Sequence, residues 1–378
     1  MPQITLEEAS SGRQNNFNFL RFLLAGLVIV NHSFSLLHDN GEPLTLLTHG
    51  QKALGRVAVD FFFVISGFLI ANSWQHSKTA WDYLKKRILR IYPGYIAAVL
   101  STVFVFGLLG AHGSAAYLHS IPLKKLFLDI FRLHNIVPLP TFAQNPVPEN
   151  LNGSLWSIAI EFECYLLLMA IGWLGFLRQR KWTLALFTLG VLLNIGFLYS
   201  VPGLHQISAH IPAGMGGKLR LVTCFLSGTT MYLYRDKIRL SPLLFGISLA
   251  VLILTAVTTG FTVALMIFGA YGLFYVAFSP KVKLNAWGKK ADLSYGIYLY
   301  GWPIQQLTIF YLGRSLHPYL LTLIVLPLSC LCAAVSWYCV ESPFLRLKNI
   351  DSRKKPGVGA TTEPPAVTVT PHEVKATL

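Results

Sequence analysis

The stretch Asn18–Phe34, NFLRFLLAGLVIVNHSF, decides the fold class because it is a helix-length apolar run with Arg21 near one end and His32 near the other. A helix needs about 20 mostly apolar residues to cross a bilayer. Similar runs recur along almost the whole chain of 378 residues, of which 53% are hydrophobic and only 12% are charged. Soluble domains average about 25% charged residues. The sequence therefore predicts an all-α, polytopic transmembrane helical bundle.

The apolar runs predict about ten spans. If the chain starts inside the cell, most of its 31 Lys and Arg residues fall in the inner loops, as is typical of cytoplasmic loops. We therefore expect both termini on the cytoplasmic side. The seventh and eighth spans are separated only by residues 258–260, so they form either a tight turn or one merged segment. The expected spans are residues 17–37, 55–75, 91–111, 153–177, 182–200, 219–234, 242–259, 261–279, 292–312 and 318–340.

The chain divides into a membrane domain, residues 1–345, and a tail, residues 346–378, that is basic at first and then disordered. The net charge of +15 does not indicate a nucleic-acid partner, because the basic residues form short clusters between apolar runs. The polar N-terminus argues against a removable signal peptide. All five cysteines lie inside expected spans, so we expect neither a disulfide framework nor a metal site.

Ionisable residues inside a membrane are usually functional. Arg21 and His32 are eleven residues apart, close to three helical turns, so they share one face about 16 Å apart along the axis. This face suggests a polar shaft through the bundle. In the alternative interpretation, each residue lies at a helix end and only anchors the helix at the interface.

A second polar interruption lies in VDFFFVISGFLIANSW, residues 59–74. Asp60 sits at a depth similar to that of His32, where a carboxylate could orient the imidazole. Ser66 and Gly67 mark a place where another backbone or a ligand approaches closely. Helix packing explains this pair better than a binding role of Ser66 does.

Two further stretches carry charged or aromatic residues. In LKKRILRIYPGY, residues 84–95, Arg87 and Arg90 lie on one helical face and suit phosphate oxygens, although a basic loop also serves as a lipid anchor. In NGSLWSIAIEFECYLL, residues 152–167, Glu161 and Glu163 point to different faces, so one is interfacial and the other a candidate acid or base.

The stretch DLSYGIYLYGWPIQQ, residues 292–306, places several hydroxyls and amides on a helix, among them Tyr295. Such a lining suits a sugar or a cofactor, and it also suits plain pairing between helices.

Taken together and in this order, these motifs and VESPF at residues 340–344 resemble the integral-membrane acyltransferase-3 family. Its members are bacterial O-acyltransferases of cell-surface polysaccharides, lipopolysaccharide O-antigens and Nod factors. The resemblance covers residues 17–345, with one departure: Gly301 stands where many members have histidine.

The resemblance implies a multi-pass enzyme of the bacterial inner (cytoplasmic) membrane that moves an acyl group, most simply acetyl, from cytoplasmic acyl-CoA to a hydroxyl on the outer side. Its partners would be acetyl-CoA, a glycan or lipid-linked saccharide and membrane lipids. The resemblance implies catalytic roles for His32, with Asp60 or Glu161 orienting it. Donor contacts would come from Arg21, Arg87, Arg90, Ser66 and Tyr295.

Two mechanisms follow. His32 either removes the proton of the acceptor hydroxyl, which we favour, or is itself acylated. Two other classes of function stay open on the sequence: a proton-coupled transporter, and a non-catalytic component of a polysaccharide export pathway. The sequence does not identify the acceptor or the oligomeric state.

Overall fold

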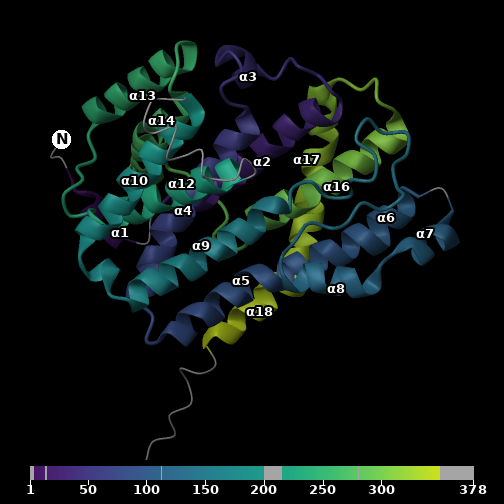
Figure 1. Ribbon diagram of the computed structural model, residues 1–378, viewed down its shortest axis with the longest axis horizontal. Coiled ribbons are helices and arrows are strands. Elements are labelled where there is room, and N and C mark those ends of the chain that lie inside the picture. Colours follow the sequence, from purple (N-terminus) through teal and green to yellow (C-terminus); the bar gives the residue numbers. More distant parts are fainter. Residues whose placement is uncertain (1–3, 13–14, 112, 200–214, 280, 350–378) are drawn as a thin grey trace, which may run out of the picture.

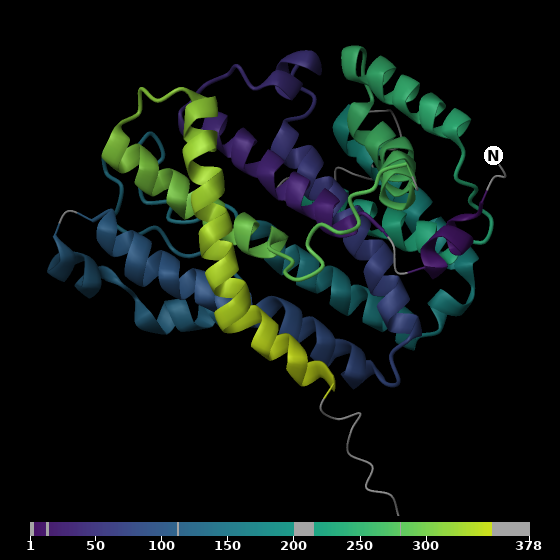
Figure 2. The same ribbon diagram turned by 180° about the vertical axis from the view of Figure 1, so that it is seen from behind.

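The computed structural model describes residues 4–12, 15–111, 113–199, 215–279 and 281–349, and these form helices and connecting loops (Figures 1 and 2). The expected all-α class is confirmed. The helices are α1 (Leu6–Ser11), α2 (Phe17–Leu36), α3 (Pro43–Leu47), α4 (Leu54–Gln75), α5 (Ala80–Ser101), α6 (Gly107–Leu109), α7 (Ser114–Ser120), α8 (Leu123–Phe131), α9 (Trp156–Trp173), α10 (Arg180–Tyr199), α12 (Gly216–Leu233), α13 (Pro242–Val257), α14 (Phe261–Ala264), α15 (Ala270–Phe278), α16 (Ser294–Leu312), α17 (Pro318–Ser336) and α18 (Ser342–Arg346).

Three π-helical turns join some of these helices into longer rods. They are η1 (Thr102–Phe106), between α5 and α6, η4 (Leu265–Gly269), between α14 and α15, and η5 (Trp337–Glu341), between α17 and α18. Among the described residues, 7 helical rods are long and apolar enough to cross a membrane: residues 17–36, 54–75, 80–109, 156–173, 180–199, 261–278 and 318–346.

The other three expected spans are also helices. α13 is apolar but shorter, with 16 residues. α12 and α16 carry polar residues that they bury inside the bundle, such as Thr229 in α12 and Gln305 and Gln306 in α16. A helix surrounded by other helices does not need the hydropathy of one that faces lipid, because neighbouring helices satisfy its polar groups.

Large apolar side chains cover the outside of the rods. Leu323 in α17 is 70% exposed and Ile253 in α13 is 66% exposed. Soluble monomers rarely expose such continuous apolar surface, whereas lipid is a favourable environment for it. The chain is therefore a multi-pass membrane protein.

The helix of the third expected span is longer than the span itself. α5 begins at Ala80, eleven residues before the expected start of the span at residue 91, and its rod reaches Leu109. The hydroxyl of Thr79 caps its first turn by accepting from the Asp82 amide (3.0 Å). Low hydropathy at residues 84–90 hid the first turns, although Arg87 and Arg90 point into the protein and not into lipid.

The long connection after α6 is folded onto the bundle. It contains α7 and α8, and its second half packs against α16. The amide of Asn145 donates to the backbone and side-chain oxygens of Gln306 (both 2.8 Å), and the amide of Asn152 donates to the Leu299 carbonyl (2.8 Å). These bonds fix the loop that leads into α9.

The turn between α13 and α14 separates the seventh and eighth expected segments. It passes through Gly260 in the left-handed region (φ 93°), which glycine adopts at little cost. The expected tail lies outside the described residues beyond Asn349.

α4 and α12 cross in close contact, with α2 and α9 packed against α4 and α10 against α12 (Figure 1). α16 packs on the other side of α2 and against α5. α17 covers α2 and α16, and α18 runs beside α5 (Figure 2). α2, α4, α5, α9 and α16 together surround the candidate site.

Candidate functional site

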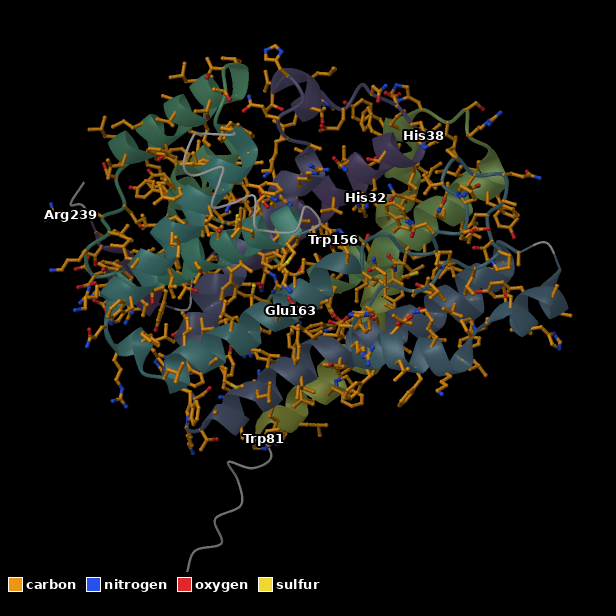
Figure 3. The ribbon with its side chains drawn as sticks, in the orientation of Figure 1. His32, His38, Trp81, Trp156, Glu163 and Arg239 are labelled. Carbon is orange, nitrogen blue, oxygen red and sulfur yellow. The ribbon has the colours of Figure 1, made fainter. Side chains whose placement is uncertain are left out.

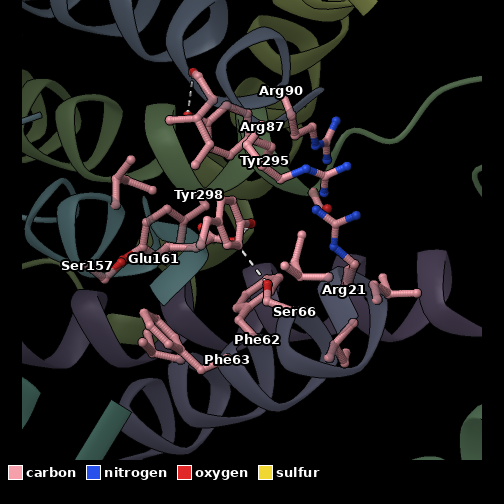
Figure 4. A pocket seen from close by; sticks show the side chains of 18 residues that line it. Arg21, Phe62, Phe63, Ser66, Arg87, Arg90, Ser157, Glu161, Tyr295 and Tyr298 are labelled. Carbon is pink, nitrogen blue, oxygen red and sulfur yellow. Dashed lines mark hydrogen bonds between the residues drawn. The ribbon is translucent and has the colours of Figure 1, made fainter. Parts of the chain in front are cut away.

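A pocket lies among α2, α4, α5, α9 and α16 (Figure 4). Six of the eight predicted site residues line this pocket, although they are distant in the sequence: Arg21, Ser66, Arg87, Arg90, Glu161 and Tyr295.

Three guanidinium groups gather on one side of the pocket (Figure 4). Arg21 and Arg90 both bind one oxygen of Asp292, Oδ2, at 2.6 and 2.7 Å. The other oxygen of Asp292 accepts from the hydroxyl of Ser294 (2.6 Å) at the start of α16. Asp292 thus ties α2, α5 and α16 together and positions two of the three guanidiniums.

The third guanidinium, that of Arg87, lies against aromatic rings. Its central carbon is 5.7 Å from the ring centre of Tyr83 and 5.9 Å from that of Tyr165. One terminal nitrogen donates to the hydroxyl of Ser73 (3.1 Å). The buried Nε of Arg87 has no hydrogen-bond partner among the described residues. Such a guanidinium retains donors for an anionic ligand.

A carboxylate with two hydroxyl donors lies in the middle of the pocket. Ser66 donates to Oε1 of Glu161 (2.9 Å), and the hydroxyl of Tyr165 donates to the same oxygen. Glu163, two residues further along α9, points to another face and pairs with Lys218 (Figure 3). The predicted division between one inward and one outward acid is confirmed.

Aromatic and hydroxyl groups line the pocket opposite the arginines (Figure 4). The hydroxyls of Ser157 and Tyr298 lie 2.6 Å apart, and the rings of Phe62 and Tyr298 are 6.2 Å apart. Tyr295, one turn before Tyr298, lies on the arginine side instead: its hydroxyl donates to the Ile91 carbonyl (2.9 Å), and the Arg90 guanidinium lies over its ring.

His32 lies outside this pocket, close to where α2 meets α16 (Figure 3). Its ring packs edge-on against the ring of Trp302, with 4.8 Å between centres. Within the described part of the chain, neither ring nitrogen has a hydrogen-bond partner. Arg21 contacts Asp292 just before α16 and His32 contacts Trp302 within α16, so the two residues share a face of α2, as their spacing predicts.

The expected shaft is not continuous in this structure. Trp302 lies four residues after Tyr298, on the same face of α16 and about 6 Å further along its axis. The pocket therefore ends about one helical turn before the Trp302–His32 pair.

Asp60 does not orient His32, which corrects the sequence-based expectation. Its two oxygens bind Lys52 (2.6 Å) and Arg220 (2.8 Å), and all three side chains are buried or nearly so. Burial lowers the pKa of Lys52 and nearby Arg220 adds to this, while Asp60 counteracts both. Glu161 likewise binds Ser66 and Tyr165 and not His32.

Asp292 is the site residue that sequence reasoning missed. It stands directly before an apolar helix, where an acid is usually explained by its favourable interaction with the helix dipole. A useful signal was available: the inner half of the bundle contains several arginines that need a counter-charge. Tyr165 was also missed, because a tyrosine in an apolar helix does not stand out.

Comparison with known proteins gives consistent matches over nearly the whole chain. A family model described as an acyltransferase domain matches residues 14–341. An O-acetyl transferase of Shigella phage Sf6 is 27% identical over 347 residues, covering 88% of this chain and 96% of that protein. Nodulation protein 10 of Rhizobium leguminosarum bv. viciae is 27% identical over 362 residues, covering 90% of this chain and 96% of that protein.

A shorter similarity links the chain to acyltransferase MdmB of Streptomyces mycarofaciens, 26% identical over 242 residues, which covers 61% of this chain and 56% of that protein. No solved structure matches the chain significantly.

Proposed function

Because the chain belongs to the acyltransferase-3 family and is thus a membrane acyltransferase, we propose that it transfers an acetyl group from cytoplasmic acetyl-CoA to a hydroxyl of an exported glycan or lipid-linked saccharide. The name of the similar phage enzyme, an O-acetyl transferase, supports acetyl as the group that moves. The family resemblance supports a surface glycan as the acceptor and the bacterial inner membrane as the location.

One observation carries the proposal: three guanidiniums line one side of a pocket whose far end lies about one helical turn from the Trp302–His32 pair. Arg21, Arg87 and Arg90 suit the phosphates of coenzyme A, because guanidinium forks bind phosphate oxygens at two points. The pantetheine arm would then extend past Glu161, where amide groups find hydrogen-bonding partners, and carry the thioester toward Ser157 and Tyr298.

His32 acts in this proposal as general base. Its ring nitrogens are free of partners from the described protein, so one of them can accept the proton of the acceptor hydroxyl. The hydroxyl oxygen attacks the thioester carbon, the carbon–sulfur bond breaks, and the proton passes from the imidazolium to the thiolate of coenzyme A. An acyl-histidine intermediate is the alternative that labelled acetyl-CoA without acceptor would reveal.

The topology belongs to the same proposal. Basic inner loops favour both termini in the cytoplasm. The end of α2 that carries Arg21 then faces the cytoplasm, and the end that carries His32 faces outward. Donor and acceptor would meet from opposite sides of the membrane.

The test measures two quantities on purified protein in lipid nanodiscs: the affinity for acetyl-CoA, and the transfer of labelled acetyl to glycan extracted from the host membrane. We expect His32→Ala to retain the affinity and to lose transfer by about 100-fold or more, the usual contribution of a general base. The double variant Arg87→Ala with Arg90→Ala should lose the affinity. Arg180→Ala is the control, because Arg180 forms an exposed ion pair with Asp236, away from the pocket.

Two results would contradict the proposal. If wild-type protein does not bind acetyl-CoA, then acetyl-CoA is not the acetyl donor. If His32→Ala transfers acetyl at the wild-type rate, His32 is not the base, and a non-catalytic role for this histidine follows.

A further inference from the structure

We propose that Tyr298, held by Ser157, donates a hydrogen bond to the carbonyl oxygen of the donor thioester and stabilises the negative charge that develops on it during transfer. The inference rests on the proposed function and adds a catalytic residue to it. Its basis is the placement of the two hydroxyls at the end of the pocket that lies toward His32.

The first argument is position. Ser157 and Tyr298 line the pocket on the side away from the arginines (Figure 4). Tyr298 also lies one turn of α16 before Trp302, which contacts His32. A thioester whose phosphates bind the arginines has its carbonyl at this end, between the hydroxyl pair and the imidazole.

The second argument is the chemistry of this end of the pocket. The neighbouring walls are apolar, formed by Phe62, Phe63 and Ile158. Glu161 is an acceptor and would repel an oxyanion. Among the described residues that line this end, Ser157 and Tyr298 therefore supply the side-chain donors.

The third argument is a count of protons. Two hydroxyls 2.6 Å apart share one hydrogen bond, in which one of them donates and the other accepts. The accepting hydroxyl retains its own proton for a third group. Both residues are buried, Ser157 at 4% and Tyr298 at 7% exposure, so water competes little for that proton. When Ser157 donates to Tyr298, the phenol proton is free for the carbonyl oxygen.

In the reaction, the acceptor oxygen forms a bond to the carbonyl carbon while His32 takes the hydroxyl proton. The carbonyl π electrons move to oxygen, which accepts the hydrogen bond from Tyr298. The tetrahedral intermediate then collapses, the carbon–sulfur bond breaks, and the imidazolium protonates the leaving thiolate. A donor that waits where the charge develops stabilises the transition state more than the bound substrate.

Tyr298→Phe tests the inference, with acetyl-CoA as the probe in the nanodisc assay. We expect kcat to fall about 100-fold, as for loss of one oxyanion donor, with KM and Kd for acetyl-CoA within about threefold of wild type. Ser157→Ala should give a smaller loss of kcat, and Ser157→Thr, which keeps the hydroxyl, should recover most of it. Tyr300→Phe is the matched control, because Tyr300 is a buried tyrosine of the same helix that faces Ser101 and Ser336 and not the pocket.

The outcomes separate this inference from the proposed function. If the Tyr298→Phe enzyme has the wild-type kcat, the inference is overturned. The proposed function still stands in that case, because the wild-type protein transfers acetyl. An increase in acceptor-independent hydrolysis of acetyl-CoA also overturns it, because the pair would then act as a seal against water. A wild-type protein with no acetyl-CoA binding overturns the function itself.

Discussion

Substitution of a buried charged residue should destabilise this protein more than most other single substitutions. The cluster of Lys52, Asp60 and Arg220 contains two cations and one anion, and it is nearly excluded from solvent. Removing one partner of a buried pair leaves the other charge uncompensated, which costs about 3–5 kcal/mol. Asp60 therefore holds α4, α12 and the segment before α4 together.

We expect Asp60→Asn to lower the thermal unfolding temperature strongly, because two buried cations lose their shared carboxylate. Lys52→Met should be milder, since it leaves the pair of Asp60 and Arg220 intact. The measurement is thermal unfolding in detergent, followed by size-exclusion chromatography. An Asp60→Asn protein with wild-type stability and no transferase activity would show instead that Asp60 takes part in catalysis.

The residue types of the site were predictable, but their partners were not. Arg21, Asp60 and Glu161 stood out because a charge in an apolar run is costly and needs a reason. Their partners lie far away in the sequence: 271 residues separate Arg21 from Asp292. Depth along a helix suggested that Asp60 meets His32, yet depth does not give the direction in which a side chain points.

At the level of helices, the backbones of α4 and α12 approach each other closely. A methyl group on Gly67 would lie 1.9 Å from the Phe225 carbonyl oxygen, and one on Gly228 would lie 1.9 Å from the Val64 carbonyl oxygen. Each glycine thus leaves room for the backbone of the other helix at the same crossing. The close backbone approach expected at Gly67 is confirmed, and it positions neighbouring Ser66 against Glu161.

Gly67→Ala and Gly228→Ala should each destabilise the protein by at least as much as an overpacked core, about 1–3 kcal/mol, because backbone must move to admit the methyl group. Gly246→Ala is the control, since Gly246 also lies within a helix, α13, and a methyl group there meets nothing within 4 Å. Thermal unfolding of the three variants under the same conditions gives the comparison. Equal stability of Gly67→Ala and Gly246→Ala would contradict the close crossing.

Helix existence was easier to predict than helix length. Hydropathy found the apolar half of the rod that ends at Leu109 and missed its first turns from Ala80, where basic residues face the pocket. α16 is a full-length helix of low hydropathy, because its polar residues are buried among other helices. Hydropathy measures fitness for lipid, so it is least informative for helical turns that bury polar side chains inside the bundle.

At the scale of the whole molecule, the pocket and His32 lie on one line along α2 and α16, with the arginines at one end. The account requires that end to face the cytoplasm. In a cysteine-free background, Lys181→Cys should react with a membrane-impermeant maleimide in inverted vesicles, and Ser114→Cys should react in intact spheroplasts. Both side chains are exposed in the structure. Reaction of both from the same side would contradict the proposed topology.

The central claim is that a donor held by the arginines delivers its thioester beside Tyr298 and toward His32. The most direct measurement is a cryo-electron microscopy structure of the His32→Ala variant with acetyl-CoA. The account predicts phosphates at Arg21, Arg87 and Arg90 and a thioester carbonyl within hydrogen-bonding distance of the Tyr298 hydroxyl. Coenzyme bound elsewhere, or bound with its thioester away from α16, would contradict it.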